Sequence, residues 1–424
     1  MKALYDLNLL DDIDVISSVS GGGYASYWLY SRYDGLEGTR FGAGAYEEDV
    51  FPRNVCTLSR KSEFFPLNRM LVAIFSPRDK AFRKYSEAIE WSFGVEDGRS
   101  RSERREARDS RRTLQSLNDQ IATGRAPYFI LNATIEAKRT KSRSSLREIE
   151  RSFEIAPTYR GSALLGFSDW PDDSNIERWS DAVAVSAAAL RCKLSRRIPN
   201  YSSEVLNTRI DLADGGFSEN LAALPLIARK IKNIVIIDAE NDPGYRFESY
   251  SMLKAYLKAT GVELAVAKID EFLAVKKRPK KVFTTAAVAK GSARHQDGTE
   301  SNIYYIKMSR PASIFPDELR GANRAKDIPP YRSKSRPASC QMDELEPITR
   351  ESLGREMLSY SRFLNKKWFW RHIVGVLPYI NYNFPQITTI DQTFYSDQLE
   401  AFIGLGYLEA CEMAGEIPVS GTCK

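Results

Sequence analysis

A serine followed by three glycines, in the stretch SSVSGGGYAS at residues 17–26, constrains this chain more than any other feature. The β-branched run before it predicts a strand, and the aromatic run after it predicts a helix opened by glycine. A serine on a sharp strand-to-helix turn needs small neighbours two positions away, and here these are Ser18 and Gly22. The pattern S-x-S-x-G is a close variant of the G-x-S-x-G nucleophile elbow, although a phosphate-binding loop or a plain turn fits the same letters. Ser20 is therefore a candidate nucleophile.

The same turn carries backbone donors that ester chemistry would need. The N–H of Gly21 would point into the space above Ser20, where an acyl oxyanion forms, and Gly22 keeps the turn free of a side chain. The helix that follows adds the positive end of its dipole at that place. Gly23 would let this helix start close to a substrate.

A serine nucleophile needs a base, and the chain offers few candidates. Its two histidines, His295 and His372, lack the strand-end context of a triad base, so we expect one exposed and one packed in a helix. Asp214 follows a predicted strand and precedes a helix, and Gly215 and Gly216 permit a tight turn there. A carboxylate in a partly desolvated cleft can take the serine proton directly. An ordinary Asp-Gly-Gly turn is the alternative interpretation.

Strand and helix signals alternate along the first part of the chain. Residues 126–137 and 232–244 predict buried strands, 180–190 predict a helix of small residues, and 208–231 predict a strand, a turn and a helix. Strands that are apolar throughout and alternate with helices predict an α/β fold with a mostly parallel sheet covered on both faces.

The organisation of the chain follows from these signals. We expect a catalytic core at residues 1–245, interrupted by a polar, irregular insert at about 35–118. Residues 246–424 would be an extension that completes the same domain, with a basic excursion at about 270–345 and an amphipathic helix at 399–413 near the end.

The net charge of the chain and the length of its apolar runs indicate which partners and which cellular location to expect. The chain has 61 basic and 55 acidic residues, a formal charge of +6, which mildly favours an anionic surface and does not indicate nucleic acid. We find no signal peptide and no run of the roughly 18 apolar residues that cross a bilayer. We therefore expect a cytoplasmic protein that either stays in solution or binds a membrane peripherally.

The cysteines and acidic residues predict neither cross-links nor metal. Five widely spaced cysteines without a CxxC pair argue against a disulfide framework and against a zinc site, and they fit a reducing compartment. No cluster of metal ligands and no calcium loop is visible. We expect no metal and no cofactor.

Together the two glycine-rich turns resemble those of the patatin-like phospholipase family, whose members use a Ser–Asp dyad. IDVISSVSGGG (13–23) is similar to the nucleophile elbow of the family, so Ser20 corresponds to its nucleophile. DLADGGFSENLA (211–222) is similar to its D-G-[GA] motif, so Asp214 corresponds to its base.

Two segments between these motifs extend the resemblance. APYFILNAT (126–134) is similar to the central strand of the family, and SDAVAVSAAAL (180–190) to the helix before the Asp strand. The resemblance covers about residues 1–245, and residues 384–407 are similar to the tail of larger bacterial members. It implies a patatin-like three-layer α/β/α fold with a mostly parallel central sheet and a helical C-terminal part.

One element of the family has no counterpart in this sequence. A G-G-G-x-R-G loop precedes the elbow in the family and supplies most of its oxyanion hole, whereas residues 1–16 hold no such loop and start like the helix that follows it. We expect a misassigned start, a truncated form or a degraded relative. Losing one oxyanion donor costs about 100- to 1000-fold in rate, so activity would be impaired.

The resemblance implies a lipid acyl hydrolase of the phospholipase A or lysophospholipase type. Its substrate would be a phospholipid or another lipid ester, and an acyl-enzyme would form on the serine. Basic runs at 101–112 and 276–281 either approach anionic headgroups or are solvated surface. Tyr24, Tyr27 and Trp28 either line an acyl pocket or pack in the core. A non-catalytic binding protein and a Ser-His-Asp α/β-hydrolase are the alternatives.

Overall fold

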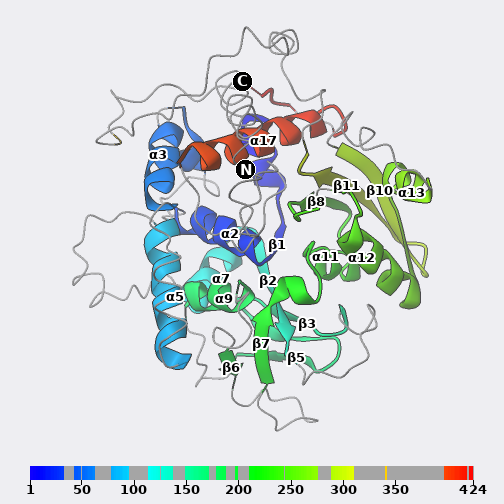
Figure 1. The fold of residues 1–424 in the computed structure, drawn as a ribbon, viewed down its shortest axis with the longest axis horizontal. Helices are drawn as coiled ribbons and strands as arrows, with labels where there is room; N and C mark the ends of the chain where they lie inside the picture. Colours follow the sequence, from blue (N-terminus) through cyan, green and yellow to red (C-terminus); the bar gives the residue numbers. More distant parts are fainter. Residues whose placement is uncertain are drawn as a thin grey trace, which may run out of the picture.

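Two β-sheets and the helices around them make up the described part of the chain (Figure 1). The structure is a computed structural model, and it describes residues 1–32, 43–48, 50–62, 78–94, 113–124, 126–136, 149–170, 178–187, 196–198, 210–242, 244–275, 288–309, 340, 396–417 and 420–423.

The larger sheet has seven strands and is built around β2 (Tyr128–Ile135). Its order is β5-β4-β3-β2-β7-β6, and β1 also pairs with β2. The other strands are β1 (Val15–Val19), β3 (Ser152–Ile155), β4 (Tyr159–Ser162), β5 (Gly166–Asp169), β6 (Arg196–Ile198) and β7 (Ile210–Asp214). β2 is buried along its length because strands flank it on both edges and helices cover it.

Two strands of this sheet meet end to end on one edge of β2. β1 pairs with residues 128–132 of β2, and β7 pairs with residues 133–135. Since β3 occupies the opposite edge, β1 and β7 share the remaining one. β1 is parallel to β2 and β7 is antiparallel, so their carboxyl ends converge, with Val19 opposite Asn132 and Asp214 opposite Ala133.

Helices α2 (Gly21–Ser31) and α9 (Trp179–Ser186) pack on this sheet where β1, β2 and β7 meet. Their buried residues form the main core with those of β2, including Tyr27, Leu131 and Val183. Around them lie α3 (Phe51–Ser62), α5 (Arg78–Phe93) and α7 (Leu114–Ala122), with the short 3-10 helices η1 (Leu10–Asp12) and η2 (Ala43–Tyr46). Figure 1 shows α3, α5, α7 and α9 together on one side of the molecule.

The second sheet has four strands in the order β8-β11-β10-β9. These strands are β8 (Asn233–Asp238), β9 (Val262–Ala265), β10 (Val288–His295) and β11 (Glu300–Lys307). Helices α11 (Leu224–Ala228), α12 (Glu248–Ala259) and α13 (Ala267–Ala274) accompany it, and the 3-10 helix η4 (Gly215–Phe217) lies just after β7. A separate core joins this sheet to α12 and α13 through residues such as Ile236, Leu253 and Tyr305.

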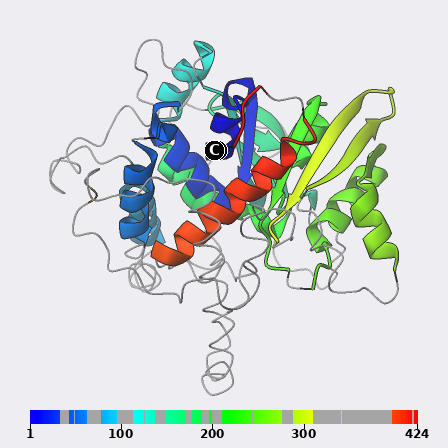
Figure 2. The ribbon, with the colours of Figure 1, turned by 90° about the horizontal axis from the view of Figure 1, so that it is seen from above.

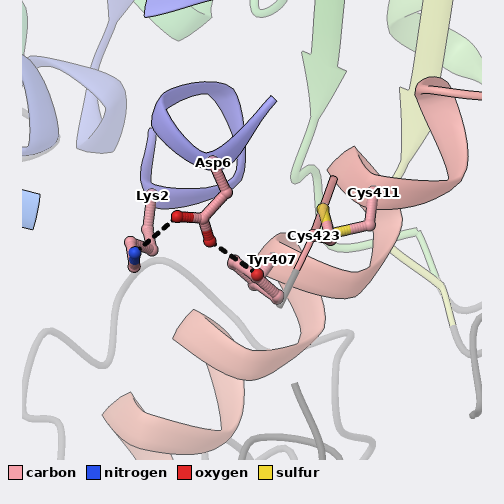
Figure 3. Close-up of a disulfide and its surroundings, with 5 residues drawn as sticks. All are labelled: Lys2, Asp6, Tyr407, Cys411 and Cys423. Carbon is pink, nitrogen blue, oxygen red and sulfur yellow. Dashed lines mark hydrogen bonds and ion pairs between the residues drawn. A yellow bond between two sulfur atoms is a disulfide. The ribbon is translucent and has the colours of Figure 1, made fainter. Parts of the chain in front are cut away.

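A long C-terminal helix connects the two halves. α17 (Ser396–Met413) contacts α1 (Lys2–Asp6) and α3 at the larger sheet, and β10 and β11 at the smaller one. Figure 2 shows it crossing from the side of α3 to the second sheet. Tyr407 of α17 donates a hydrogen bond to Asp6, which also accepts one from Lys2 (Figure 3). The predicted helix near the C-terminus is confirmed.

The prediction of one mostly parallel sheet was wrong, because the described strands form two sheets and most of their pairings are antiparallel. Within the described residues the larger sheet has one parallel pairing, β1 with β2, and the others are antiparallel. β8 lies in the second sheet and alternates between buried and exposed residues, so Val235 and Ile237 face outward. The apolar run at β8 is therefore a strand with one buried and one exposed face. The composition of a strand alone does not reveal which of its faces are packed.

Two segments expected to be irregular contain regular structure. The predicted insert at 35–118 includes α3 and α5, whose Val55 and Ile89 are buried in the main core. The predicted excursion at 270–345 includes β10 and β11, which pair along their lengths. β8 of the predicted core pairs with β11 of the predicted extension, which was expected to complete the same domain. The basic runs at 101–112 and 276–281 lie outside the described residues.

The cysteine prediction is also corrected. Cys56 pairs with Cys340, and Cys411 pairs with Cys423, which joins the C-terminal residues to α17 (Figure 3). Their Cα atoms are 5.9 and 6.0 Å apart, within the range that a disulfide spans. Cys56 and Cys340 are 284 residues apart, so sequence spacing could not reveal the pair. The expectation of a reducing compartment, which rested on the cysteines, loses this support.

A buried carboxyl on α17 should make stability depend on pH. Glu409 is 1% exposed and accepts a hydrogen bond from the Ser309 N–H at 2.7 Å, and burial raises its pKa well above the usual range. The folded state therefore keeps a proton that the unfolded state releases, and this contribution is lost as pH rises through the folded-state pKa. We expect Glu409→Gln to remove that loss, so its melting temperature should rise relative to the wild type with increasing pH.

Glu416→Gln is the matched control, because Glu416 lies just beyond the same helix but is exposed and paired with Lys290. Its melting temperature should follow the wild-type curve. A difference between Glu409→Gln and wild type that stays constant from acidic to alkaline pH would contradict the prediction.

Candidate active site

Ser20 stands at the junction between β1 and α2 with an unusual backbone conformation. Its φ is 49° and its ψ is −120°, a positive φ that a side chain with a Cβ rarely adopts. Such strained residues persist only where the surrounding structure holds them, and they concentrate at functional sites. The predicted strand, sharp turn and helix are all present.

Asp214 is the last residue of β7 and is 6% exposed. Its Oδ1 accepts the N–H of Gly216 at 2.8 Å, which fixes the carboxylate as the N-cap of η4. Gly215 passes so close to β2 that an added Cβ would lie 2.2 Å from the carbonyl oxygen of Asn132. This turn thus needs glycine at 215 for close approach of two backbones.

The two turns bring their side chains together. The Ser20 hydroxyl donates a hydrogen bond to Oδ2 of Asp214 at 2.9 Å, across 194 residues of sequence. Asp214 thereby accepts from a hydroxyl through one oxygen and from a backbone N–H through the other. This arrangement can transfer a proton from the serine to the carboxylate without an intervening imidazole.

The glycines after Ser20 differ in their surroundings. A Cβ on Gly21 would meet nothing within 4 Å, and one on Gly22 would make an ordinary contact, 3.5 Å from the Cβ of Ser18. A Cβ on Gly23 would lie 3.3 Å from both Leu131 and Val183. Gly23 is therefore buried where α2 packs against β2 and α9, and its expected role beside a substrate stays a prediction.

Sequence patterns missed the residues that hold the two turns. Ser186, at the end of α9, accepts the Ser20 N–H at 3.0 Å and donates to the Asn132 carbonyl at 2.6 Å. The Asn132 side chain donates to the Ser17 hydroxyl and to the Ser18 carbonyl, each at 2.9 Å. Ser186 lies in the segment 180–190 that resembles a family helix. Its contacts could not be predicted, because they join α9 to Ser20 and to Asn132, which are far away in the sequence.

The loop after Asp214 is organised by another buried carboxyl. Glu219 accepts the backbone N–H groups of Leu221, Ala223 and Leu224 at 2.6 to 3.2 Å. Burial raises its pKa, while these three hydrogen bonds oppose the shift. On the other side, Thr134 of β2 donates to the Gly215 carbonyl at 3.2 Å. The loop is therefore held independently of any ligand.

The one histidine that the structure describes lies in the second sheet, not at the turns of Ser20 and Asp214. His295 is buried at the end of β10 in the second sheet, so the expectation of an exposed histidine is wrong. Its backbone N–H pairs with Thr299, as the strand turns toward β11. His372 lies outside the described residues. Across the described ranges, no group of three or more His, Cys, Asp or Glu residues is placed to hold a metal ion.

Comparison with known proteins finds a likeness in fold. No family model and no curated protein matches the chain. Among solved structures, human GIVD cytosolic phospholipase A2 has a similar fold, with a TM-score of 0.53 and 12% identity. The match covers 97% of this chain and 58% of the human chain, so this chain spans less than two thirds of that structure. At this identity the likeness concerns the fold alone.

The close approach at Gly215 leads to a stability prediction. Gly215→Ala would drive a methyl group into the Asn132 carbonyl, so we expect a loss of at least about 2 kcal/mol in the free energy of unfolding. Gly406→Ala is the matched control, because Gly406 is exposed in α17 and a Cβ there meets nothing within 4 Å.

Gly406→Ala should stabilise the protein by about 0.5–1 kcal/mol, since alanine favours the helix. Urea denaturation of both variants and the wild type provides the measurement. Equal unfolding free energies for Gly215→Ala and wild type would contradict the packing described at this turn.

Proposed function

We propose that this protein is a lipid acyl hydrolase in which Ser20 is the nucleophile and Asp214 its base. The hydrogen bond from the Ser20 hydroxyl to the buried Asp214 carboxylate carries the proposal. A strained serine at a strand-to-helix turn supports it, because this conformation presents the hydroxyl at the end of the sheet. The fold likeness to a phospholipase A2 favours esters of lipids as the substrate class.

The reaction would proceed through an acyl-enzyme. The Ser20 oxygen attacks the ester carbonyl carbon while its proton passes to Asp214. The tetrahedral intermediate then expels the alcohol, which takes the proton from Asp214. Water attacks the acyl-enzyme and gives a proton to Asp214, and the serine leaves with that proton as the fatty acid is released. Asp214 thus alternates between carboxylate and acid.

Gly21 and Gly22 are the donors that we assign to the oxyanion. Their N–H groups belong to the first turn of α2, which precedes the intrahelical hydrogen-bond ladder. The N–H of Ser20 already donates to Ser186, and that of Gly23 to the Ser20 carbonyl. The positive end of the α2 dipole adds to the stabilisation of negative charge at this point.

The substrate would reach this site from a lipid surface, consistent with a phospholipid or another lipid ester. Of the aromatic residues proposed to line an acyl pocket, Tyr27 and Trp28 are buried in the main core. Tyr24 is half-buried and stacks on Phe93, with ring centroids 5.0 Å apart. We therefore restrict the lining role to Tyr24. Among the described helices none is both long and apolar enough to cross a membrane.

Removing either member of the pair should abolish activity. We expect Ser20→Ala and Asp214→Asn each to lower fatty-acid release from mixed phospholipid vesicles and from p-nitrophenyl esters by a factor on the order of 1000 or more. The reason is that the first variant has no nucleophile, while the second leaves the hydroxyl without a base.

Asp119→Asn is the control, because Asp119 is exposed on α7, a helix that carries no residue of the two turns. The activity of this variant should equal that of the wild type. Hydrolysis that survives Ser20→Ala would refute the proposed nucleophile. An inactive wild type on every ester tested would instead favour a binding protein with this fold.

A further inference from the structure

We infer that Ser186 is a positioning residue that holds Ser20 in its reactive conformation, an inference that rests on the function proposed above. Its hydroxyl lies at the end of α9 and is completely buried, 0% exposed. It accepts the Ser20 N–H at 3.0 Å and donates to the Asn132 carbonyl at 2.6 Å. The hydroxyl therefore bridges the strained residue and the central strand.

The bridge controls the torsion angle that matters. Ser20 has a positive φ, and rotation about its N–Cα bond to the ordinary negative range would turn its side chain relative to its N–H. Ser186 holds the N–H of Ser20 and Asp214 holds its hydroxyl, so the two hydrogen bonds together keep φ at its positive value. Without this acceptor a partly buried backbone N–H would lose its partner, which removes the preference for the strained form.

Asn132 extends the bridge to the second turn. Its side chain donates to Ser17 and Ser18 in β1, so it holds the strand that leads into Ser20. Its carbonyl, which accepts from Ser186, is also the group against which the Gly215 backbone packs. One peptide of β2 thus sets the positions of both turns, and Ser186 is the side chain that ties the elbow to it.

Within α9, the last residue, Ser186, is the one that reaches Ser20. Val183, one turn earlier, packs against Gly23 of α2, so α2 and α9 approach closely. Ser180 and Asp181, at the other end of α9, contact Ser86 of α5 instead. The helix is therefore anchored at both ends, and Ser186 meets Ser20 from a rigid support.

The test combines variants at Ser186 with a probe that reacts only with an activated serine. We expect Ser186→Ala to lower the rate at which a fluorophosphonate labels Ser20 about tenfold, with kcat reduced and KM unchanged for a p-nitrophenyl ester. Ser186→Thr keeps the hydroxyl and should restore much of the rate. Should Ser186→Ala fail to fold, Ser186→Cys replaces it, because a thiol keeps the volume and hydrogen-bonds weakly.

Ser31→Ala is the matched control. Ser31 is a buried serine in α2 that donates to the carbonyls of Trp28 and Phe93, so its loss also removes a buried hydrogen bond. It should lower the melting temperature at least as much as Ser186→Ala and leave the labelling rate unchanged. Labelling of Ser186→Ala at the wild-type rate would overturn the inference.

Amide hydrogen exchange at Ser20 separates this inference from the proposed function. In protein labelled with ¹⁵N-serine, Ser186→Ala should speed exchange of the Ser20 N–H about tenfold, while Ser31→Ala should not change it. If the wild type is neither labelled nor active, the proposed function fails and exchange still decides whether Ser186 holds the elbow. Unchanged exchange in Ser186→Ala would refute that role.

Discussion

The pairing of β1 and β7 with one edge of β2 is the constraint on which the site depends. Because one strand runs parallel and the other antiparallel to β2, their carboxyl ends converge on Asn132 and Ala133. The residue after β1 is Ser20 and the last residue of β7 is Asp214, so strand register alone places a hydroxyl beside a carboxylate. The 2.9 Å hydrogen bond between them follows from the sheet, before any loop contact is considered.

This convergence requires the backbone to be crowded, which explains the surplus of glycine. Gly215 is needed because its backbone crosses the Asn132 carbonyl, while at Gly23 an added Cβ would make a tight contact with Leu131 and Val183. Gly21 is different, since a side chain there would meet nothing within 4 Å. Two glycines thus serve packing, while the one with open space around it is the position where a substrate oxygen would need a free N–H.

Local patterns in the sequence predicted the elements of the site well. The strand, elbow and helix around Ser20, the central strand β2, the strand and turn at Asp214 and the helix α17 are all present. Patterns failed where a segment depends on distant partners. The helices α3 and α5 look polar but bury residues such as Phe82 and Val55, and β8 pairs in a second sheet rather than in the first. The disulfide between Cys56 and Cys340 joins segments that no spacing rule relates.

The sequence by itself determined the conformation of the two turns, because glycine and small residues act on the backbone within a few positions. It also supplied Ser20 and Asp214 as the polar groups at those turns. Only the tertiary structure decided that they meet, that β2 runs antiparallel to β7, and that Ser186 accepts the Ser20 N–H. Strand direction and register depend on hydrogen bonds between segments far apart in the chain, and a pattern of side chains with a period of two residues does not specify them.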